Sequence, residues 1–454
     1  NVLKCAVERI EKGDVELSRI TKNVLVIDEA QDMNEDEFSL IEALIRHNDD
    51  MRIIAVGDDD QSIYEFRHAS PQYFKRLIRE YGAMKYELVE NFRSKSNLVD
   101  FTNQFVARIH HRLKENPIIA KQADNGKIKV VRYKSENLIE PLVKDILSAE
   151  LRGSVCVLTY TNDEALQVSG LLLKNGMPAQ LIQDNSGFCL LKLDEINFFL
   201  SRLHSVEDIF LIDDDVWEQA KKELQTVFQN SSKLESCLGL IRDFETINPK
   251  RRYKSDLELF IRESKLNDFF GESGETIFVS TIHKVKGKEF DHVFLMLNNF
   301  NLSSDERIRQ LYVAMTRARR DLTIHLNSDF LDGLSSEDVE YMEDKIDYSP
   351  PEELAIHLTH SDIWLDYFIQ RQPQIARIRS GDTLYVRGDE CLDGNGQSVL
   401  KFSRNFMSEH YERLHRQGYE LKRAMVNFIV YWQSEKVAKE IKIILPELFF
   451  ERKK

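Results

Sequence analysis

The sequence predicts an α/β protein with parallel sheets, a helical insertion and a small β-rich C-terminal domain. Three observations support this fold class. Short apolar runs of strand length alternate with helically spaced apolar residues from Val24 to Leu326, as expected of parallel strands covered by helices on both faces. Strand signals stop between Leu190 and Gly274, where helical spacing replaces them. They return in the tail, around a turn sequence at 393–396.

Length and composition exclude several classes of protein. The chain has 454 residues, 42% of them hydrophobic, which gives it the length of roughly three domains and makes disorder as a whole unlikely. Only 18 Gly and 9 Pro are present, which excludes collagen-like and linker-like sequences. The five Cys lie far apart without a CxxC pair, so we expect reduced thiols in a cytoplasmic protein rather than a disulfide framework or a zinc ribbon. No apolar run approaches the ~18 residues of a membrane span, and no membrane partner is expected.

The charge distribution does not exclude a nucleic-acid partner. The formal net charge is −14, but it is unevenly spread along the chain. Residues 328–370 contain 12 Asp or Glu and one Lys, whereas residues 371–454 contain 16 Lys or Arg and 11 Asp or Glu. Because salt screens charges beyond about one Debye length, the local groups matter more than the total.

The first 93 residues alternate between predicted strands and helices. Residues 24–27, 52–56 and 86–89 are apolar runs of strand length. Asn34, with Glu37 three residues later, has the pattern of a capping box and predicts the start of a helix. Strands separated by helices in this way predict a parallel sheet.

Later elements follow from the same reasoning. Helical spacing from Val216 to Val227 predicts helix within the insertion, and the acidic segment after Ser328 is interpreted as a helical or loose connector. The tail is expected to form a small barrel-like domain with an inserted helix at 404–416. Further strands are predicted at 127–132, 155–159, 276–281, 292–297 and 322–326, and in the tail at 383–386, 398–402 and 426–432.

Two predicted strands end in polar turns that suit phosphate chemistry. The first ends in Asp28-Glu29, at the carboxyl edge of a parallel sheet, where such folds bind ligands. One carboxylate can hold Mg²⁺ through its water shell, while the next orients or deprotonates an attacking water. Alternatively, the two acids only cap the following helix. In the second turn, the neutral Gln61 could sense a terminal phosphate.

Aromatic and basic residues follow the second turn. Tyr64 and Phe66 stand at alternate positions with Arg67 beside them. This arrangement suits stacking on unpaired bases together with a phosphate contact. The alternative is that both aromatic side chains pack inside, which is the commoner fate of aromatic residues.

Three more segments offer groups for a nucleotide or a nucleic-acid backbone. Phe92 is a candidate adenine platform and Arg93 a candidate phosphate clamp. The basic loop at 280–290 has a glycine at its turn and could hold a nucleic-acid backbone. The alternative interpretation is a solvated basic loop without a ligand. Arg317 lies four residues past Val313 on a predicted helix, and a guanidinium presented to a γ-phosphate can contribute ~10³–10⁵ in rate.

In this order, the segments resemble motifs II to VI of the UvrD/Rep family of superfamily 1 DNA helicases. The resemblance covers about residues 20–330, and its most specific parts are 57–64, 283–290 and 313–318. It implies two RecA-like core domains that close on ATP and open after hydrolysis. It also implies movement along one DNA strand in the 3′→5′ direction.

The resemblance implies a role for each matching residue. Asp28 would bind Mg²⁺ and Glu29 would activate water. Gln61 would contact the γ-phosphate of ATP, which Arg93 and Arg317 would clamp from the two core domains. The remaining implied contacts are Phe92 with adenine, Glu289 with the nucleotide ribose, and Tyr64, Phe66, Arg67, His283 and Lys286 with single-stranded DNA.

The expected domain organisation follows from the motifs and the element pattern. We expect a truncated RecA-like first core domain, a second core domain in two parts, a short helical insertion, an acidic connector and a small β-rich C-terminal domain. The first core domain is expected at residues 1–93, the two parts of the second core domain at 94–189 and 275–328, and the helical insertion between those parts at 190–274. The acidic connector is expected at 329–370 and the C-terminal domain at 371–454.

Some positions depart from the family pattern. Glu65 and His68 stand where the family usually has small residues, and Lys288 stands where an apolar residue is usual. Tyr160 occupies a position where an Arg is common. The helical insertion is short for the family, and no comparable resemblance covers the tail.

A phosphate-cradling loop of the form G-x-x-x-x-G-K-[ST] is missing from the sequence. The Gly-Lys pairs at 126–127 and 287–288 lack both the upstream Gly and the following Ser or Thr. We therefore expect a fragment, separated from an N-terminal part that carries this loop, which hydrolyses ATP negligibly alone. The lost strand is expected to leave the first sheet with an open edge or an incomplete core, so that residues 1–93 are its least secure part.

Three functional classes remain in view. The leading one is an ATP-dependent DNA helicase or translocase that acts on single-stranded or duplex DNA as a monomer. The alternative is a non-catalytic DNA-binding or regulatory module. A nuclease is disfavoured because no acidic-x-Lys pattern follows the acids at 382 and 389–390. The tail is expected to serve as a structural or protein-docking domain.

Overall fold

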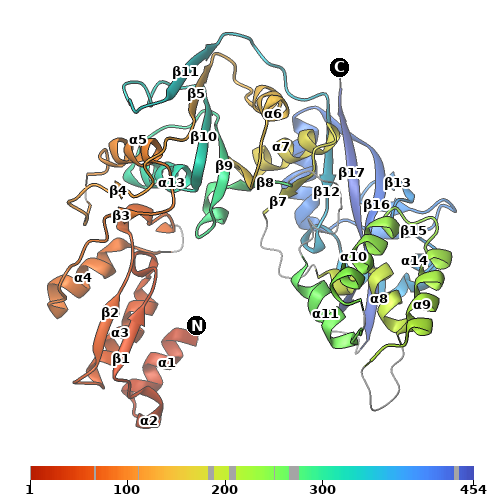
Figure 1. Cartoon of the computed structure of the whole chain (residues 1–454), viewed down its shortest axis with the longest axis horizontal. Helices are drawn as coiled ribbons and strands as arrows, with labels where there is room; N and C mark the ends of the chain where they lie inside the picture. The colour runs from red at the N-terminus through yellow and green to blue at the C-terminus, as the bar shows by residue number, and fades with distance from the viewer. Residues whose placement is uncertain are drawn as a thin grey trace. The chain divides into compact units, whose positions relative to one another are not determined.

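The protein forms two compact units, made of residues 1–162 with 280–348 (unit 1) and residues 163–279 with 349–454 (unit 2) (Figure 1). They are seen in a computed structural model. It describes residues 2–65, 68–110, 112–182, 189–203, 211–249, 251–264, 276–433 and 439–453.

The N-terminal part of unit 1 is built on two parallel strands, and both were predicted. Leu25, Ile27 and Ala55 turn toward a small hydrophobic core that includes Phe38 and Ile41. The strands are β1 (Val24–Ile27) and β2 (Arg52–Ala55), and the helices nearby are α1 (Val2–Glu11), α2 (Leu17–Ile20), α3 (Glu35–Arg46) and α4 (Pro71–Tyr81).

The other face of this two-stranded sheet is apolar and exposed. Val24 and Val26 are 50% and 62% exposed, and Ile54 and Val56 are 40% and 47% exposed. All four side chains lie on one face, because they alternate with the core residues and Val26 pairs with Ile54. Parallel sheets are normally covered on both faces, so this part of the chain buries less apolar area than its sequence offers.

The strand predicted at 86–89 does not form. Tyr86 and Leu88 are 79% and 84% exposed, and the residues have no regular structure. The strand instead starts at β3 (Glu90–Asn91), which pairs in parallel with β4 (Ile119–Ala120). An apolar run becomes a strand only where a neighbouring strand can pair with its backbone. The Val89 carbonyl accepts one hydrogen bond from the Ile119 N–H over 2.7 Å, but no strand in the described part of the chain runs alongside residues 86–88.

A larger parallel sheet confirms the α/β fold class. Its seven strands have the order β11-β5-β10-β9-β6-β8-β7, and every residue of β6 is buried. The strands are β5 (Ile128–Tyr133), β6 (Val155–Thr159), β7 (Ala179–Leu181), β8 (Ile277–Thr281), β9 (Phe290–Leu297), β10 (Ala318–Leu326) and β11 (Val339–Asp344). The helices of this region are α5 (Ser96–Val106), α6 (Ile139–Ser148), α7 (Asn162–Lys174) and α13 (Asp305–Met315).

Two features of this region correct the sequence analysis. The acidic segment after Ser328 is not a helical or loose connector throughout, because β11 pairs in parallel with β5 along 128–133. As an edge strand, β11 is mostly exposed, so it carries no apolar alternation that would reveal it. In addition, α13 ends at Met315, so Arg317 lies just beyond the helix rather than on it.

Unit 2 combines helices with an antiparallel sheet of six strands, in the order β12-β17-β16-β13-β14-β15. The helices are α8 (Asp194–Arg202), α9 (Asp214–Val227), α10 (Leu234–Ile247), α11 (Lys254–Glu263), α14 (Gln372–Ile375) and α15 (Glu412–Arg416). The strands are β12 (Glu353–His357), β13 (Thr383–Arg387), β14 (Glu390–Leu392), β15 (Ser398–Lys401), β16 (Tyr419–Gln433) and β17 (Glu440–Arg452).

The helices and the sheet of unit 2 share one hydrophobic core, and Figure 1 shows α8 to α11 beside the strands. Trp217 and Phe244 from the helices and Phe368 and Ile443 from the C-terminal part belong to the same buried cluster. Glu195 at the start of α8 is also buried and accepts hydrogen bonds from Ser231 and Ser380. No helix among the described residues is long and apolar enough to cross a bilayer.

Candidate functional site

The turn after β1 presents two exposed carboxylates. Glu29 has a φ of 51°, a left-handed conformation that is strained for a residue with a Cβ. Its backbone N–H donates to Oδ1 of Asp28 over 2.9 Å, and its Oε2 accepts from the buried Gln31 over 2.6 Å. These contacts fix the two acids at the carboxyl end of β1, where the sequence predicted them.

Gln31 also joins this turn to the turn after β2. Its Oε1 accepts a hydrogen bond from the backbone N–H of Asp58 over 2.9 Å. A Cβ at Gly57 would lie 2.5 Å from the same Oε1, so only glycine permits this approach. The two strand ends therefore form one polar surface.

Gln61 and Arg317 meet, although they are 256 residues apart in the sequence. Nη2 of Arg317 donates to Oε1 of Gln61 over 3.0 Å. Nε of the same Arg317 donates to the Val313 carbonyl, and its Nη1 donates to the Lys288 carbonyl. Arg317 is only 2% exposed. Burial, assisted by the positive charge of Arg93, lowers the pKa of Arg317 to about 10, which leaves it a cation at neutral pH.

Glu289 lies between two arginines. It forms ion pairs with Arg93 and with Arg319, and the pKa of Glu289 is lowered mainly by its hydrogen bond with Arg319. The backbone N–H of Arg93 donates to Oδ1 of Asn91 over 2.9 Å, which fixes the turn after β3. Phe92 beside it is 69% exposed, so its ring is available for stacking.

The residues predicted to face DNA divide into three groups. The hydroxyl of Tyr64 donates to the His283 carbonyl over 3.2 Å, so these two residues lie together. Lys286 pairs with Asp32 in the turn after β1 and donates to the Gln61 carbonyl over 3.0 Å. Its Nζ also lies 5.2 Å from the ring centre of Tyr64. Its side chain is only 8% exposed. The two remaining candidates, Phe66 and Arg67, lie outside the described residues.

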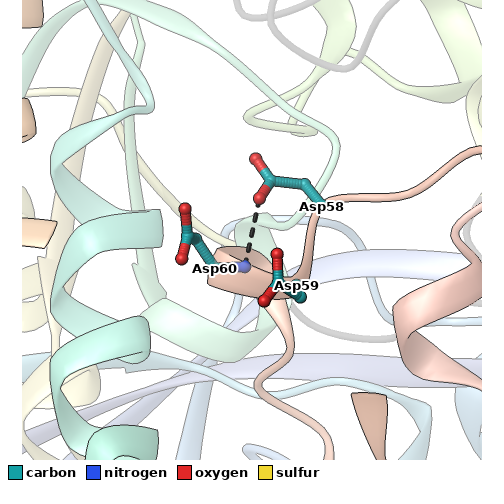
Figure 2. A group of neighbouring side chains, drawn as sticks. All are labelled: Asp58, Asp59 and Asp60. Atoms are coloured by element: carbon teal, nitrogen blue, oxygen red, sulfur yellow. Dashed lines mark hydrogen bonds between the residues drawn. The ribbon is translucent and has the colours of Figure 1, made fainter. Parts of the chain in front are cut away.

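Three consecutive carboxylates stand in the second turn (Figure 2). Asp58, Asp59 and Asp60 offer oxygens within 4.8 Å of one another. However, Lys114 Nζ lies 2.7 Å from Asp58 and 3.0 Å from Asp60, and Arg112 donates twice to Asp60 over 2.9 and 2.8 Å. These cations already pair with Asp58 and Asp60, so the cluster does not suit a metal ion. The exposed carboxylate of Asp28 fits Mg²⁺ better.

A cavity of about 120 Å³ adjoins this arrangement. Gln61, Arg93 and Thr316 line it, together with Asn91 and Tyr312. Small-molecule pockets typically measure ~300–1,000 Å³, so a nucleotide would need more room here than this cavity provides.

Sequence reasoning missed three cations of this site. Arg319 belongs to a basic run that was visible in the sequence, but nothing indicated its pairing with Glu289. Arg112 and Lys114 belong to no recognisable motif. They contact Asp60 and Asp58 in the turn after β2 from a segment about 50 residues away in the chain.

Family comparisons agree with the order of these segments. The model of the UvrD/REP helicase N-terminal domain matches residues 13–82, and that of the UvrD-like helicase C-terminal domain matches residues 86–205 and 204–329. The second model alone covers more than half of the chain. The chain belongs to the UvrD/Rep helicase family. The resemblance inferred from the motifs is thereby confirmed.

Individual relatives of this UvrD/Rep family chain match it in part. ATP-dependent DNA helicase Rep of Buchnera aphidicola subsp. Acyrthosiphon pisum is 29% identical over 183 residues, which are 39% of this chain and 28% of that protein. Gabija protein GajB of Bacillus cereus is 24% identical over 335 residues, 69% of this chain and 66% of GajB. Among solved structures, the C-terminal domain of a possible DNA helicase from Lactobacillus plantarum WCFS1 is 14% identical, with a TM-score of 0.28. The match covers 55% of this chain and 98% of that structure's chain.

Proposed function

We propose that this chain is part of an ATP-dependent DNA helicase or translocase that moves 3′→5′ along single-stranded DNA. The observation that supports this most is the contact of Arg317 with Gln61 over 3.0 Å. It joins the turn after β2 to the segment after α13, and the charge of Glu29 is close enough to raise the pKa of Arg317 against the larger effect of burial. The Glu29 carboxylate, the neutral amide of Gln61 and the guanidinium of Arg317 thus lie around one position.

The roles follow from the chemistry of these groups. Bound Mg²⁺ and ATP would supply the charge that the site neutralises, with Asp28 holding the metal through water. Glu29 would accept a proton from water, and Gln61 would orient that water. Arg317 and Arg93 would bind the terminal phosphate, as positively charged donors do in phosphoryl transfer.

Nucleotide binding would have to rearrange one ion pair. Arg93 and Glu289 are paired with each other, although one is proposed to bind phosphate and the other the ribose. Binding would exchange this pair for contacts with the nucleotide, while Arg319 keeps Glu289 in place. Phe92, already exposed, would stack on adenine without further change.

The second candidate is a non-catalytic DNA-binding or regulatory module. It is favoured by the absence of the G-x-x-x-x-G-K-[ST] pattern from this sequence, since backbone N–H groups and the Lys of such a loop grip the β and γ phosphates. The sequence upstream of the chain in its gene separates the two candidates. A P-loop there supports the helicase, and none supports the module.

A paired assay tests the proposal on the protein as it is. We expect the purified chain to bind single-stranded DNA, with affinity that falls steeply as salt rises. We also expect no DNA-stimulated ATP hydrolysis above that of an Arg317→Gln control. Measurable hydrolysis that Arg317→Gln abolishes would overturn the inactivity of the chain alone, and absence of DNA binding would overturn both candidates.

A further inference from the structure

Arg307 lies on an aromatic support at one end of the large sheet. Its guanidinium carbon is 4.2 Å from the ring centre of Tyr160 and 5.3 Å from that of Phe300. The two rings meet edge to face, with their centres 5.3 Å apart at 73°. Tyr160 directly follows β6, Phe300 follows β9, and Arg307 belongs to α13. Three separate elements therefore converge to hold one guanidinium flat.

The position of Arg307 is electrostatically unusual. It stands in the first turn of α13, where its backbone N–H donates to the Ser304 hydroxyl over 3.3 Å. A positive side chain is disfavoured at this end of a helix because the helix dipole is positive there. Among the residues that the structure describes, no carboxylate lies within 4.0 Å of Arg307, whereas Arg309 has Glu65 at 3.9 Å.

Arg307 is continuous with residues already proposed to face DNA. The pKa of His283 is lowered mainly by burial and to a smaller extent by the positive charge of Arg307. Gln310, one helical turn after Arg307, lies with its Nε2 3.2 Å from Nε2 of His283. Tyr64 in turn contacts the His283 carbonyl. A row of side chains thus runs from Tyr64 to Arg307 within unit 1.

We propose that Arg307 binds a phosphate of single-stranded DNA, and that Tyr160 and Phe300 position its guanidinium. This inference rests on the proposed function, since it extends the same DNA surface. A guanidinium that is held on two aromatic rings, with no described carboxylate within 4.0 Å, is available to an anion. Because Arg307 covers one face of the Tyr160 ring, Tyr160 serves as a support for the cation rather than as the platform for a base.

The salt dependence of DNA binding tests this role. Fluorescence anisotropy with a labelled oligo-dT strand would be measured over a series of salt concentrations for the unsubstituted chain and for Arg307→Gln. Each phosphate contact on a single strand contributes about 0.7 to the slope of log affinity against log salt. We expect Arg307→Gln to lower that slope by about 0.7 and the affinity by about 5–10-fold at low salt.

Matched variants separate a phosphate contact from a structural effect. Arg307→Lys keeps the charge, so we expect the slope to be retained with a smaller loss of affinity. Tyr160→Phe keeps the ring and should bind like the unsubstituted chain, whereas Tyr160→Ala should bind more weakly. Arg202 is the control, because it also lies over an aromatic ring, 4.6 Å from the centre of Phe198, but pairs with Glu223 at 3.2 Å.

The outcomes are distinguishable. If Arg307→Gln keeps the full salt slope, or if Arg202→Gln lowers it equally, the inference is overturned while the proposed function stands. If the unsubstituted chain does not bind DNA, both are overturned. Thermal unfolding of each variant reports folding, and if Arg307→Gln fails to fold, a lowered slope in Arg307→Lys would by itself overturn the phosphate contact.

Discussion

Asp60 is a buried anion held by two cations. Its side chain is 0% exposed, and it pairs with Arg112 and Lys114. Burial disfavours its charged form, but the hydrogen bond from Arg112 and the charge of Lys114 outweigh burial and hold the pKa of Asp60 below its ordinary value of 3.8. Because the folded-state pKa is lowered, Asp60 stabilises the fold above pH 3.8 and loses this contribution as the pH falls below that value.

Replacing Asp60 by Asn should therefore destabilise unit 1. The change leaves Arg112 without its buried anion and Lys114 with Asp58 alone, and breaking such a pair typically costs about 3–5 kcal/mol. Urea unfolding at pH 7 would measure the loss, which should narrow as the pH falls below 3.8. Asp50→Asn, at an exposed position, is the control and should change the free energy of unfolding by less than about 0.5 kcal/mol. Equal stability of Asp60→Asn and the unsubstituted chain at pH 7 would contradict this assignment.

At the scale of the element, α3 is stabilised by its N-terminal cap. The Asn34 side chain accepts from the Glu37 backbone over 3.0 Å, and Glu37 accepts from the Asn34 backbone over 2.9 Å. Phe38 and Ile41 on the same helix then pack into the small core beneath β1. The cap sets where the helix begins, and the packing decides which face it buries.

Removing this cap by Asn34→Ala should lower the free energy of unfolding by about 1 kcal/mol, within a range of 0.5–2. The backbone N–H of Glu37 at the start of α3 would lose its partner. Chemical denaturation of the purified chain would detect the change. Ser39→Ala on the same helix is the matched control. Its hydroxyl only donates to the Glu35 carbonyl one turn earlier, so we expect a change of less than about 0.5 kcal/mol. A loss as large in Ser39→Ala would show that the cap is not the cause.

Local patterns explain which elements the sequence predicted. Asn34 with Glu37 predicted α3 correctly, because a capping box involves only residues three apart. Residues 86–89 and β11 were misjudged, because strand formation depends on partners that local patterns do not reveal. The same limit applies to the site. Motif spacing identified Gln61 and Arg317 as candidates, but their contact, and those of Arg112 and Lys114, depend on how distant segments fold together.

At the scale of the molecule, the two compact units predict two unfolding transitions. Phe101 in unit 1 and Phe368 in unit 2 are both 0% exposed. Replacing either by Ala should cost about 3–5 kcal/mol. Each change should shift one transition in a calorimetric scan and leave the other in place. A single transition that both variants shift equally would show that the units unfold together.

The bare face formed by Val24, Val26, Ile54 and Val56 has a practical consequence in the test tube. The fluorescence of dyes such as ANS increases when they bind exposed hydrophobic surface, and this increase normally indicates a partly unfolded protein. Here the folded chain itself exposes such a surface, so we expect it to increase ANS fluorescence without any denaturant. Val26→Lys should reduce this fluorescence. Dye fluorescence alone would then mislead anyone who used it to judge whether a preparation of this chain is properly folded.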